Sequence, residues 1–272
     1  MRGAGHHVEL LRVVTTGDRL SAGGGADATR GLFVKELEEA LLDGRADLAV
    51  HSAKDLPGEL PQGLTILAVP VREDPRDVLI GPADGLAGLV SGARVGTGSP
   101  RRAAQLRLAR PDITCVEIRG NVGTRLDKLA AGDGVDALML AAAGLARLGL
   151  TPAGLSALDV ATCVPAPGQG ALAIEGRADR VDLAQVVVVL DDFATAACVR
   201  AERALLSALG GGCREPIGAL GTLQGGALHL LGFAGSEDGA ANARGEVVGA
   251  VDDAEGLGNE LAAVLSAQIT SA

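Results

Sequence analysis

The sequence predicts an α/β protein built from two α/β units and a smaller α+β unit. Two observations lead to this prediction. Short apolar runs alternate with helical patterns through residues 46–148, and a Gly-rich break at 210–212 is followed by three strand-like runs and one helix. The chain has 272 residues, which is more than one small core serves, so two or three domains are expected.

The first unit is expected to contain three strands and one helix. The apolar, β-branched runs that predict its strands lie at 8–15, 46–51 and 64–69. A Gly- and Ala-rich loop is predicted over 18–29, and apolar residues at helical spacing predict a helix over 32–42 that stops before Gly44. Strands that alternate with helices in this way are typical of a largely parallel sheet.

The second unit restarts this pattern near Asp77. Its strands are predicted at 94–97, 113–118 and 135–140, and its helices at 100–108, at 121–131 and up to residue 148. Pro- and Gly-rich residues at 164–170 then predict a crossover or hinge. The third unit is predicted to hold a helix over 193–209, strands around 217, 230 and 247, and a last amphipathic helix over 254–269.

The composition argues against several classes of protein. The formal net charge is −10 and only three residues are aromatic, all of them Phe, whereas general nucleic-acid binding uses basic stripes and stacking rings. No apolar run reaches the ~18 residues of a membrane span, and no signal-peptide core follows the first residues. We therefore expect a cytoplasmic protein with neither nucleic acid nor membrane as a partner.

The basic residues are concentrated in the second unit. Residues 94–147 hold eight Arg and one Lys against five acidic residues, although the whole chain is acidic. A coding bias explains the general excess of Arg, which number 21 against three Lys. A local basic patch on an acidic protein is different, because it indicates a small anionic ligand that planar guanidinium groups can grip.

The four cysteines do not suggest a metal centre. No pair has C-x-x-C spacing and no His lies at ligand spacing from them, so no metal is expected. Cys115, Cys163 and Cys198 lie among apolar neighbours and are predicted to be small core residues. Cys213 differs because it lies in a Gly-rich stretch beside Arg214, which favours an exposed thiol with a lowered pKa. An inert loop cysteine is the alternative.

The stretch His51-Ser52-Ala53-Lys54-Asp55 is the first candidate for chemistry. It follows a predicted strand, and ligands of open α/β sheets bind beyond the carboxyl ends of the strands. In that position Asp55 can act as an acid or base and Lys54 as a charge anchor. A solvated turn with a capping Asp is the alternative that the residues leave open.

Two stretches of the second unit are candidates for binding anions. Each places small or hydroxyl residues at the start of a helix, where free backbone N–H groups attract negative charge. The side chains concerned are Thr97, Ser99, Arg101 and Arg102 in the first stretch, Arg119, Asn121 and Arg125 in the second, and Arg147 after the next strand. Capped surface helices with solvated arginines are the alternative, but two such stretches in one unit favour a polyanionic ligand.

Eight segments, taken together, resemble the hydroxymethylbilane synthase family, which is also called porphobilinogen deaminase. They are R-G-L-F-V-K-E-L-E from residue 30, H-S-A-K-D-L-P from 51, R-E-D-P-R-D from 72, G-T-G-S-P-R-R from 96, R-G-N-V-G-T-R-L-D-K from 119, A-A-G-L-A-R-L-G from 142, P-G-Q-G-A-L from 167 and G-G-C-R-E-P from 211. Each segment alone is a weak signal, whereas eight in family order over nearly the whole chain are very specific.

This resemblance implies a three-domain fold. Domains one and two are expected to look like the α/β lobes of periplasmic binding proteins, with the active site in the cleft between them. Domain three is expected to be a smaller α+β domain with the cysteine that holds the cofactor. In this sequence the implied domains are 1–70 together with 170–187, then 71–169, then 188–272.

The resemblance also implies a reaction. Family members are transferases that join four porphobilinogen molecules head to tail, with loss of ammonia each time, on a covalently bound dipyrromethane primer. They then release the linear tetrapyrrole hydroxymethylbilane by hydrolysis. Carried over to this sequence, the thioether to dipyrromethane falls on Cys213 and the catalytic carboxylate on Asp55. Porphobilinogen is the expected small-molecule partner, and the family suggests a monomer.

The other implied roles concern carboxylates. Each pyrrole ring carries an acetate and a propionate, so the growing chain needs many fixed cations and hydrogen-bond donors. The residues expected to bind cofactor or substrate are Lys54, Ser52, Thr97, Ser99, Arg101, Arg102, Arg119, Asn121, Arg125, Arg147 and Gln169, with Phe33 near the cleft and residues 20–30 as a lid.

This chain departs from the family pattern at several positions. The family's opening strand and helix, with the motif I-A-T-R-x-S-P-L-A, has no counterpart before residue 8, so a downstream start, a fragment or a degenerate copy is expected. Ala26 and Arg30 stand where the lid usually has Lys, and Gly98 stands where a hydroxyl residue is usual. Two alternatives therefore stay open: a truncated, catalytically impaired homologue, and a non-catalytic two-lobed anion-binding module.

Overall fold

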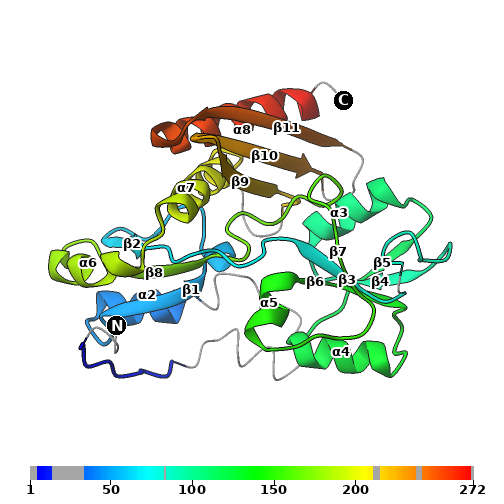
Figure 1. Ribbon diagram of the computed structural model, residues 1–272, viewed down its shortest axis with the longest axis horizontal. Coiled ribbons are helices and arrows are strands. Elements are labelled where there is room, and N and C mark those ends of the chain that lie inside the picture. Colours follow the sequence, from blue (N-terminus) through cyan, green and yellow to red (C-terminus); the bar gives the residue numbers. More distant parts are fainter. Residues whose placement is uncertain (1–4, 14–33, 83, 211–214, 237–240, 271–272) are drawn as a thin grey trace.

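The computed structural model describes residues 5–13, 34–82, 84–210, 215–236 and 241–270 of the chain. Figure 1 shows three groups of helices and strands in this part, each with its own sheet. Two of them are α/β lobes and the third is a smaller α+β unit, so the predicted fold class is confirmed. Within the described residues, no helix is long and apolar enough to cross a lipid bilayer.

The first lobe is built on a three-stranded sheet in the order β1-β8-β2. Its elements are α2 (Lys35–Leu42), β1 (Leu48–Ser52), the 3-10 turn η2 (Ala53–Asp55), β2 (Leu64–Ala68), β8 (Leu172–Arg177), α6 (Val181–Val187) and η3 (Val188–Leu190). The prediction of a largely parallel sheet is wrong for these strands. The central strand β8 returns from the second lobe and therefore runs antiparallel to both β1 and β2.

The predicted strand over 8–15 is also not observed. Residues 8–13 form no strand, and the rest of that range lies outside the described residues. Leu10 is 88% exposed, because no strand in the described part of the chain pairs with this run. An apolar, β-branched run becomes a strand only where a neighbouring strand satisfies its backbone groups.

The second lobe has a five-stranded mixed sheet in the order β5-β4-β6-β3-β7. Its elements are β3 (Asp77–Ile80), β4 (Arg94–Gly96), α3 (Pro100–Ala109), β5 (Thr114–Val116), α4 (Val122–Ala130), β6 (Ala137–Ala141), α5 (Ala142–Arg147) and β7 (Leu155–Ala157). Strand β4 runs parallel to β5 and β6, whereas β3 is antiparallel to β6 and β7. Alternate side chains of β3 and β6 pack into cores on opposite faces, with Leu79 and Met139 on one and Val78 and Leu138 on the other.

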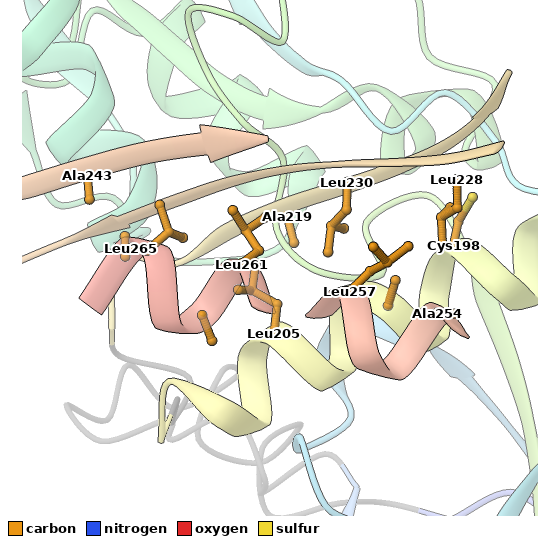
Figure 2. Close-up of a cluster of buried hydrophobic side chains, with 13 residues drawn as sticks. Cys198, Leu205, Ala219, Leu228, Leu230, Ala243, Ala254, Leu257, Leu261 and Leu265 are labelled. Carbon is orange, nitrogen blue, oxygen red and sulfur yellow. The ribbon is translucent and has the colours of Figure 1, made fainter. Parts of the chain in front are cut away.

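The third unit is an antiparallel sheet covered by two helices. Its elements are α7 (Phe193–Ala208), β9 (Gly218–Gln224), β10 (Ala227–Gly235), β11 (Asn242–Ala250), the 3-10 turn η4 (Val251–Asp253) and α8 (Ala254–Thr270), and its sheet order is β11-β10-β9. Figure 2 shows Leu205 of α7 and Leu261 of α8 facing Leu228 and Leu230 of the sheet. This unit therefore has a hydrophobic core of its own.

Residues 163–171, here called the junction segment, run from the second lobe back to the first. Sequence analysis predicts a crossover or hinge there, and the structure places every residue of the segment in the interior. The observed sheets lie within the three predicted domains, although the precise domain boundaries remain a prediction.

The third unit is joined to the junction segment by one buried carboxylate. Glu202 of α7 is 0% exposed and receives the two arms of Arg72 at 2.5 and 3.1 Å. The same carboxylate accepts the backbone N–H of Gly168 at 2.6 Å and that of Gly221, in β9, at 2.7 Å. Glu202 thus contacts three parts of the chain. These are Arg72, where the first lobe leads into the second, the junction segment and the sheet of the third unit.

We expect Glu202→Gln to lower the free energy of unfolding by about 3–5 kcal/mol, because it leaves the guanidinium of Arg72 buried without its counter-ion. Urea denaturation at pH 7 measures the change. Glu260→Gln on the exposed face of α8 is the matched control and should change stability by less than about 0.5 kcal/mol. Equal stabilities for the two variants would contradict this role of Glu202.

Candidate active site

The junction segment packs directly against the turn that contains Lys54 and Asp55. Gly168 has φ +73°, and a Cβ there would lie 2.9 Å from the carbonyl carbon of Ala53 and 3.0 Å from the backbone nitrogen of Lys54. Only glycine fits this position, because the conformation and the close approach both exclude a side chain. The Ala53 N–H also donates to the Ala171 carbonyl at 3.0 Å.

The turn lies where the sequence predicts it. Ser52 ends β1, and Lys54 and Asp55 follow in η2, half-buried at the carboxyl end of the strand. This is the strand-end position where ligands of α/β sheets are expected to bind. The catalytic role of Asp55 stays a prediction.

The junction segment also contacts Arg147 at the end of α5. Arg147 donates from Nη2 to the Gly170 carbonyl at 2.7 Å, and the Glu73 N–H donates to the same oxygen at 3.1 Å. Gly170 has φ +86°, and a Cβ would lie 2.5 Å from the Glu73 carbonyl oxygen. One buried segment thus contacts both the turn with Lys54 and Asp55 of the first lobe and Arg147 of the second.

A second buried carboxylate joins three of the predicted site residues. Asp77, at the start of β3, is 0% exposed. It receives Arg101 Nη1 at 2.7 Å, Arg102 Nε at 2.9 Å and Gln169 Nε2 at 2.9 Å. The two guanidinium groups hold the pKa of Asp77 far below its usual range despite the opposing effect of burial.

Sequence reasoning missed Asp77 as a functional residue. The only available signal was its position at the end of the R-E-D-P-R-D segment, because its partners on α3 and in the junction segment are distant in sequence. The same carboxylate is also 3.3 Å from the Cys163 thiol.

Arg101 and Arg102 are buried, with 4% and 6% of their surface exposed. Arg101 also donates to the Val164 carbonyl at 2.6 Å, and Arg102 to the Met139 carbonyl at 3.0 Å. The alternative of solvated arginines on a capped surface helix is therefore wrong for this pair. Their direct binding of cofactor or substrate carboxylates stays a prediction.

Three predicted binding residues have observed roles at helix starts. Ser99 caps α3 by accepting the Arg102 N–H, and Thr97 Oγ1 accepts the Ser99 N–H at 3.2 Å. Asn121 caps α4 by accepting the Thr124 N–H at 2.8 Å. Thr97 and Ser99 also line a cavity of about 240 Å³ at the start of α3. The helix starts are thus formed as predicted, and a hollow adjoins the first of them.

The two arginines around α4 differ in their surroundings. Arg125 donates from Nε to the Gly120 carbonyl at 2.8 Å, and burial together with the nearby positive charge of Arg102 lowers its pKa. Arg119 is exposed and pairs with Glu117 at 2.7 Å. Arg125 therefore belongs with the buried arginines of α3, whereas Arg119 lies at the surface.

The described cysteines are poor nucleophiles. Burial raises the pKa of Cys163 to about 12 and that of Cys198 to about 11, and it also raises the pKa of Cys115. All three are free thiols. Their prediction as small core residues fits Cys163 and Cys198, which are buried, whereas Cys115 is half-buried. Cys213, Phe33 and the predicted lid over 20–30 lie outside the described residues.

Comparison with known proteins decides the family. A model of the porphobilinogen deaminase dipyrromethane cofactor-binding domain matches residues 1–185, and a model of the porphobilinogen deaminase C-terminal domain matches residues 196–267. The chain belongs to the porphobilinogen deaminase family. The resemblance found in the eight sequence segments is thereby confirmed.

Curated porphobilinogen deaminases align over most of this chain. That of Roseiflexus sp. (strain RS-1) is 52% identical over 86% of this chain and 77% of its own length. That of Acidothermus cellulolyticus is 50% identical over 97% of this chain and 82% of its own length. A solved structure, the periplasmic VFT2 domain of Bordetella pertussis BvgS, is 22% identical over 57% of this chain and 64% of its own, with a TM-score of 0.35. The family assignment rests on the domain models and the curated relatives.

The depressed pKa of Asp77 predicts a specific dependence of stability on pH. At pH 7, Asp77→Asn should lower the free energy of unfolding by about 3–5 kcal/mol, because two buried guanidinium groups lose their counter-ion. The ionised carboxylate stabilises the fold in full above the unfolded pKa of about 3.9, and this contribution is lost as the pH falls further toward the folded pKa.

The stability difference between parent and Asp77→Asn should therefore be constant from pH 7 to 5 and shrink below about pH 4. Urea denaturation across this range measures it. A difference that stays constant down to pH 3 would show that Asp77 is not the ionised partner of the two arginines.

Proposed function

We propose that the chain condenses four porphobilinogen molecules head to tail, with loss of ammonia at each step, and releases hydroxymethylbilane by hydrolysis, using the residues around the junction segment. Family membership supports the reaction. The junction segment supports this placement of the site, because the turn with Lys54 and Asp55 packs against it and Arg147 donates a hydrogen bond to it. The arginines of α3 are joined to it through Asp77 and Gln169.

The residues present fit a dipyrromethane cofactor with its acetate and propionate groups. Arg102 and Arg125 are near enough for the charge of one to lower the pKa of the other, and the structure provides Arg125 with a backbone carbonyl rather than a carboxylate. Two guanidinium groups this close together are suited to share an anionic ligand. When bound, the cofactor supplies the pyrrole carbon to which the first substrate ring is joined.

The contacts of Asp77 suggest that the arginines of α3 have two roles, one in holding the fold and one in binding ligand carboxylates. Each of Arg101 and Arg102 gives part of its fork of donors to Asp77 and part to a backbone carbonyl, which fixes the orientation of both planes. Fixed planes lower the entropic cost of gripping a carboxylate. Thr97 and Ser99 then offer hydroxyl groups beside the same helix start, and Gln169 an amide from the junction segment.

Asp55 is proposed as the catalytic carboxylate. It follows β1 in a half-buried turn that packs against Gly168. When ammonia leaves porphobilinogen, positive charge develops on the substrate, and a fixed carboxylate stabilises that charge and accepts the pyrrole proton. Lys54, adjacent in the turn, would pair with a carboxylate of the substrate or cofactor.

Cys213 is proposed as the site of the thioether, and Phe33 as a residue near the cleft. The raised thiol pKa values of Cys115, Cys163 and Cys198 support Cys213 as the attachment point, since a reactive cysteine needs an accessible thiolate.

We further propose the domains 1–70 with 170–187, 71–169 and 188–272. A monomer in the cytoplasm that acts on porphobilinogen, without nucleic-acid or membrane partners, completes the proposal. The net charge of −10 supports the exclusion of nucleic acid.

The intact mass of the purified protein under denaturing conditions tests the attachment site. The parent should show an excess equal to two deaminated porphobilinogen units, and Cys213→Ser should show none. Cys115→Ser is the matched control and should keep the excess mass, because its thiol is half-buried and bonded to the Ala103 carbonyl. Excess mass that persists in Cys213→Ser would overturn this attachment.

For Asp55→Asn we expect kcat for porphobilinogen consumption to fall about 10²–10⁴-fold, as is usual for loss of a general acid or base. The rate is measured on protein whose mass shows the bound cofactor, so that loading and turnover are separated. Asp43→Asn, an exposed carboxylate at the end of α2, is the control and should keep the parent rate. A kcat of Asp55→Asn within threefold of the parent would exclude Asp55 as the catalytic carboxylate.

A further inference from the structure

Titratable side chains of the first lobe and of α7 lie close to the segment that contains Lys54 and Asp55. His51 of β1 and Glu175 of β8 meet at 2.9 Å between Nε2 and Oε2, with side chains 3% and 0% exposed. Glu38 of α2 and Arg203 of α7 are half-buried, and both are near enough to Glu175 for its charge to affect their pKa. These four residues are here called the charge cluster.

The polar atoms of the charge cluster have few directed hydrogen bonds. His51 Nε2 and both oxygens of Glu175 are buried and lack hydrogen-bond geometry to any described group, so the two side chains meet by close approach alone. One oxygen of Glu38 and Nη1 of Arg203 are also buried without a hydrogen-bond partner among the described residues. Buried polar atoms without directed hydrogen bonds depend on nearby charges for compensation.

Burial shifts the pKa values of Glu38 and Arg203. It raises the pKa of Glu38, with help from the negative charge of Glu175, and it lowers the pKa of Arg203 against the opposing effect of Glu175. A second acidic residue of α2, Glu36, also has a buried carboxylate oxygen. Removal of one charge from the cluster therefore changes the balance for every remaining member.

Two members of the cluster hold the two ends of the same segment. His51 directly precedes Ser52 and the turn at 53–55, and it pairs with Ala173 of β8 in the sheet register. Arg203 donates from Nη2 to the Gly58 carbonyl at 3.0 Å, just beyond that turn. A cavity of about 300 Å³ adjoins Gly58 and Arg203, so the segment has room to shift if this contact is lost.

We propose that His51, Glu175 and Arg203 are positioning residues for Lys54 and Asp55. The buried His51–Glu175 pair fixes one end of residues 52–58, and the bond from Arg203 to the Gly58 carbonyl fixes the other. This inference deepens the proposed function, since it rests on the roles given there to Lys54 and Asp55. Arg203 belongs to α7, the helix whose preceding residue Glu202 binds the junction segment. The third unit therefore also orients the turn of the first lobe.

Amide hydrogen exchange, followed by mass spectrometry on peptides that cover 52–58, tests the inference without reference to activity. In Glu175→Gln the exchange of these amides should be at least tenfold faster than in the parent, while the amides of α3 at 100–109 are unchanged. Unchanged exchange at 52–58 in folded Glu175→Gln would overturn the proposal.

Arg203→Lys provides a second test if Glu175→Gln does not fold. It keeps the positive charge but loses the planar fork that donates to the Gly58 carbonyl, so exchange at 52–58 should be at least threefold faster. Arg200→Lys, one turn earlier on α7 and exposed, is the matched control and should leave exchange unchanged. Equal exchange in these two variants would contradict a positioning role for Arg203.

Kinetics on cofactor-loaded protein separates this inference from the proposed function. Glu175→Gln should lower kcat at least tenfold while KM for porphobilinogen changes less than about threefold, because the arginines of the second lobe are untouched. A parent chain that consumes no porphobilinogen would refute the proposed function, whereas the exchange experiment would still decide the positioning role. A kcat of folded Glu175→Gln within twofold of the parent would refute the positioning role alone.

Discussion

Two buried carboxylates, Asp77 and Glu202, hold the junction segment, and the candidate site is assembled around it. Glu202 accepts the N–H of Gly168, and Asp77 accepts the side-chain amide of Gln169, the next residue. The Gln169 carbonyl in turn accepts Arg72 Nε at 2.8 Å. A charged group deep in a protein is costly unless it is fully compensated. Here the compensating partners come from the second lobe, the junction segment and the third unit, so the same contacts fix the junction segment against both of these units.

Burial of the junction segment explains why residues far apart in sequence become neighbours. Its backbone touches the turn at 53–55 and Arg147, and its two glycines permit approaches that any side chain would block. The crossover is therefore closely packed, and few alternative arrangements are available to it.

Sequence patterns predicted what depends on local periodicity and on motif order. Helices α3, α4, α7 and α8, the strand-end position of Lys54 and Asp55, and the family itself were all accessible in this way. The direction of β8 was not, because it depends on the return of the chain from the second lobe. Nor were the partners of Asp77 and Glu202, which lie 19 to 130 residues away in sequence. From the sequence alone, Arg101 and Arg102 could therefore have been solvated arginines, and their burial in the structure excludes this alternative.

The rate of porphobilinogen consumption by Gly168→Ala tests most directly whether the junction segment places the site. A methyl group there would press on Ala53 and Lys54, so we expect a folded protein whose rate is at least about 100-fold lower than that of the parent. Gly132→Ala is the matched control, since Gly132 has a similar φ of +66° and no atom within 4 Å of its added Cβ, and it should keep the parent rate. Equal rates for the two variants would contradict the account.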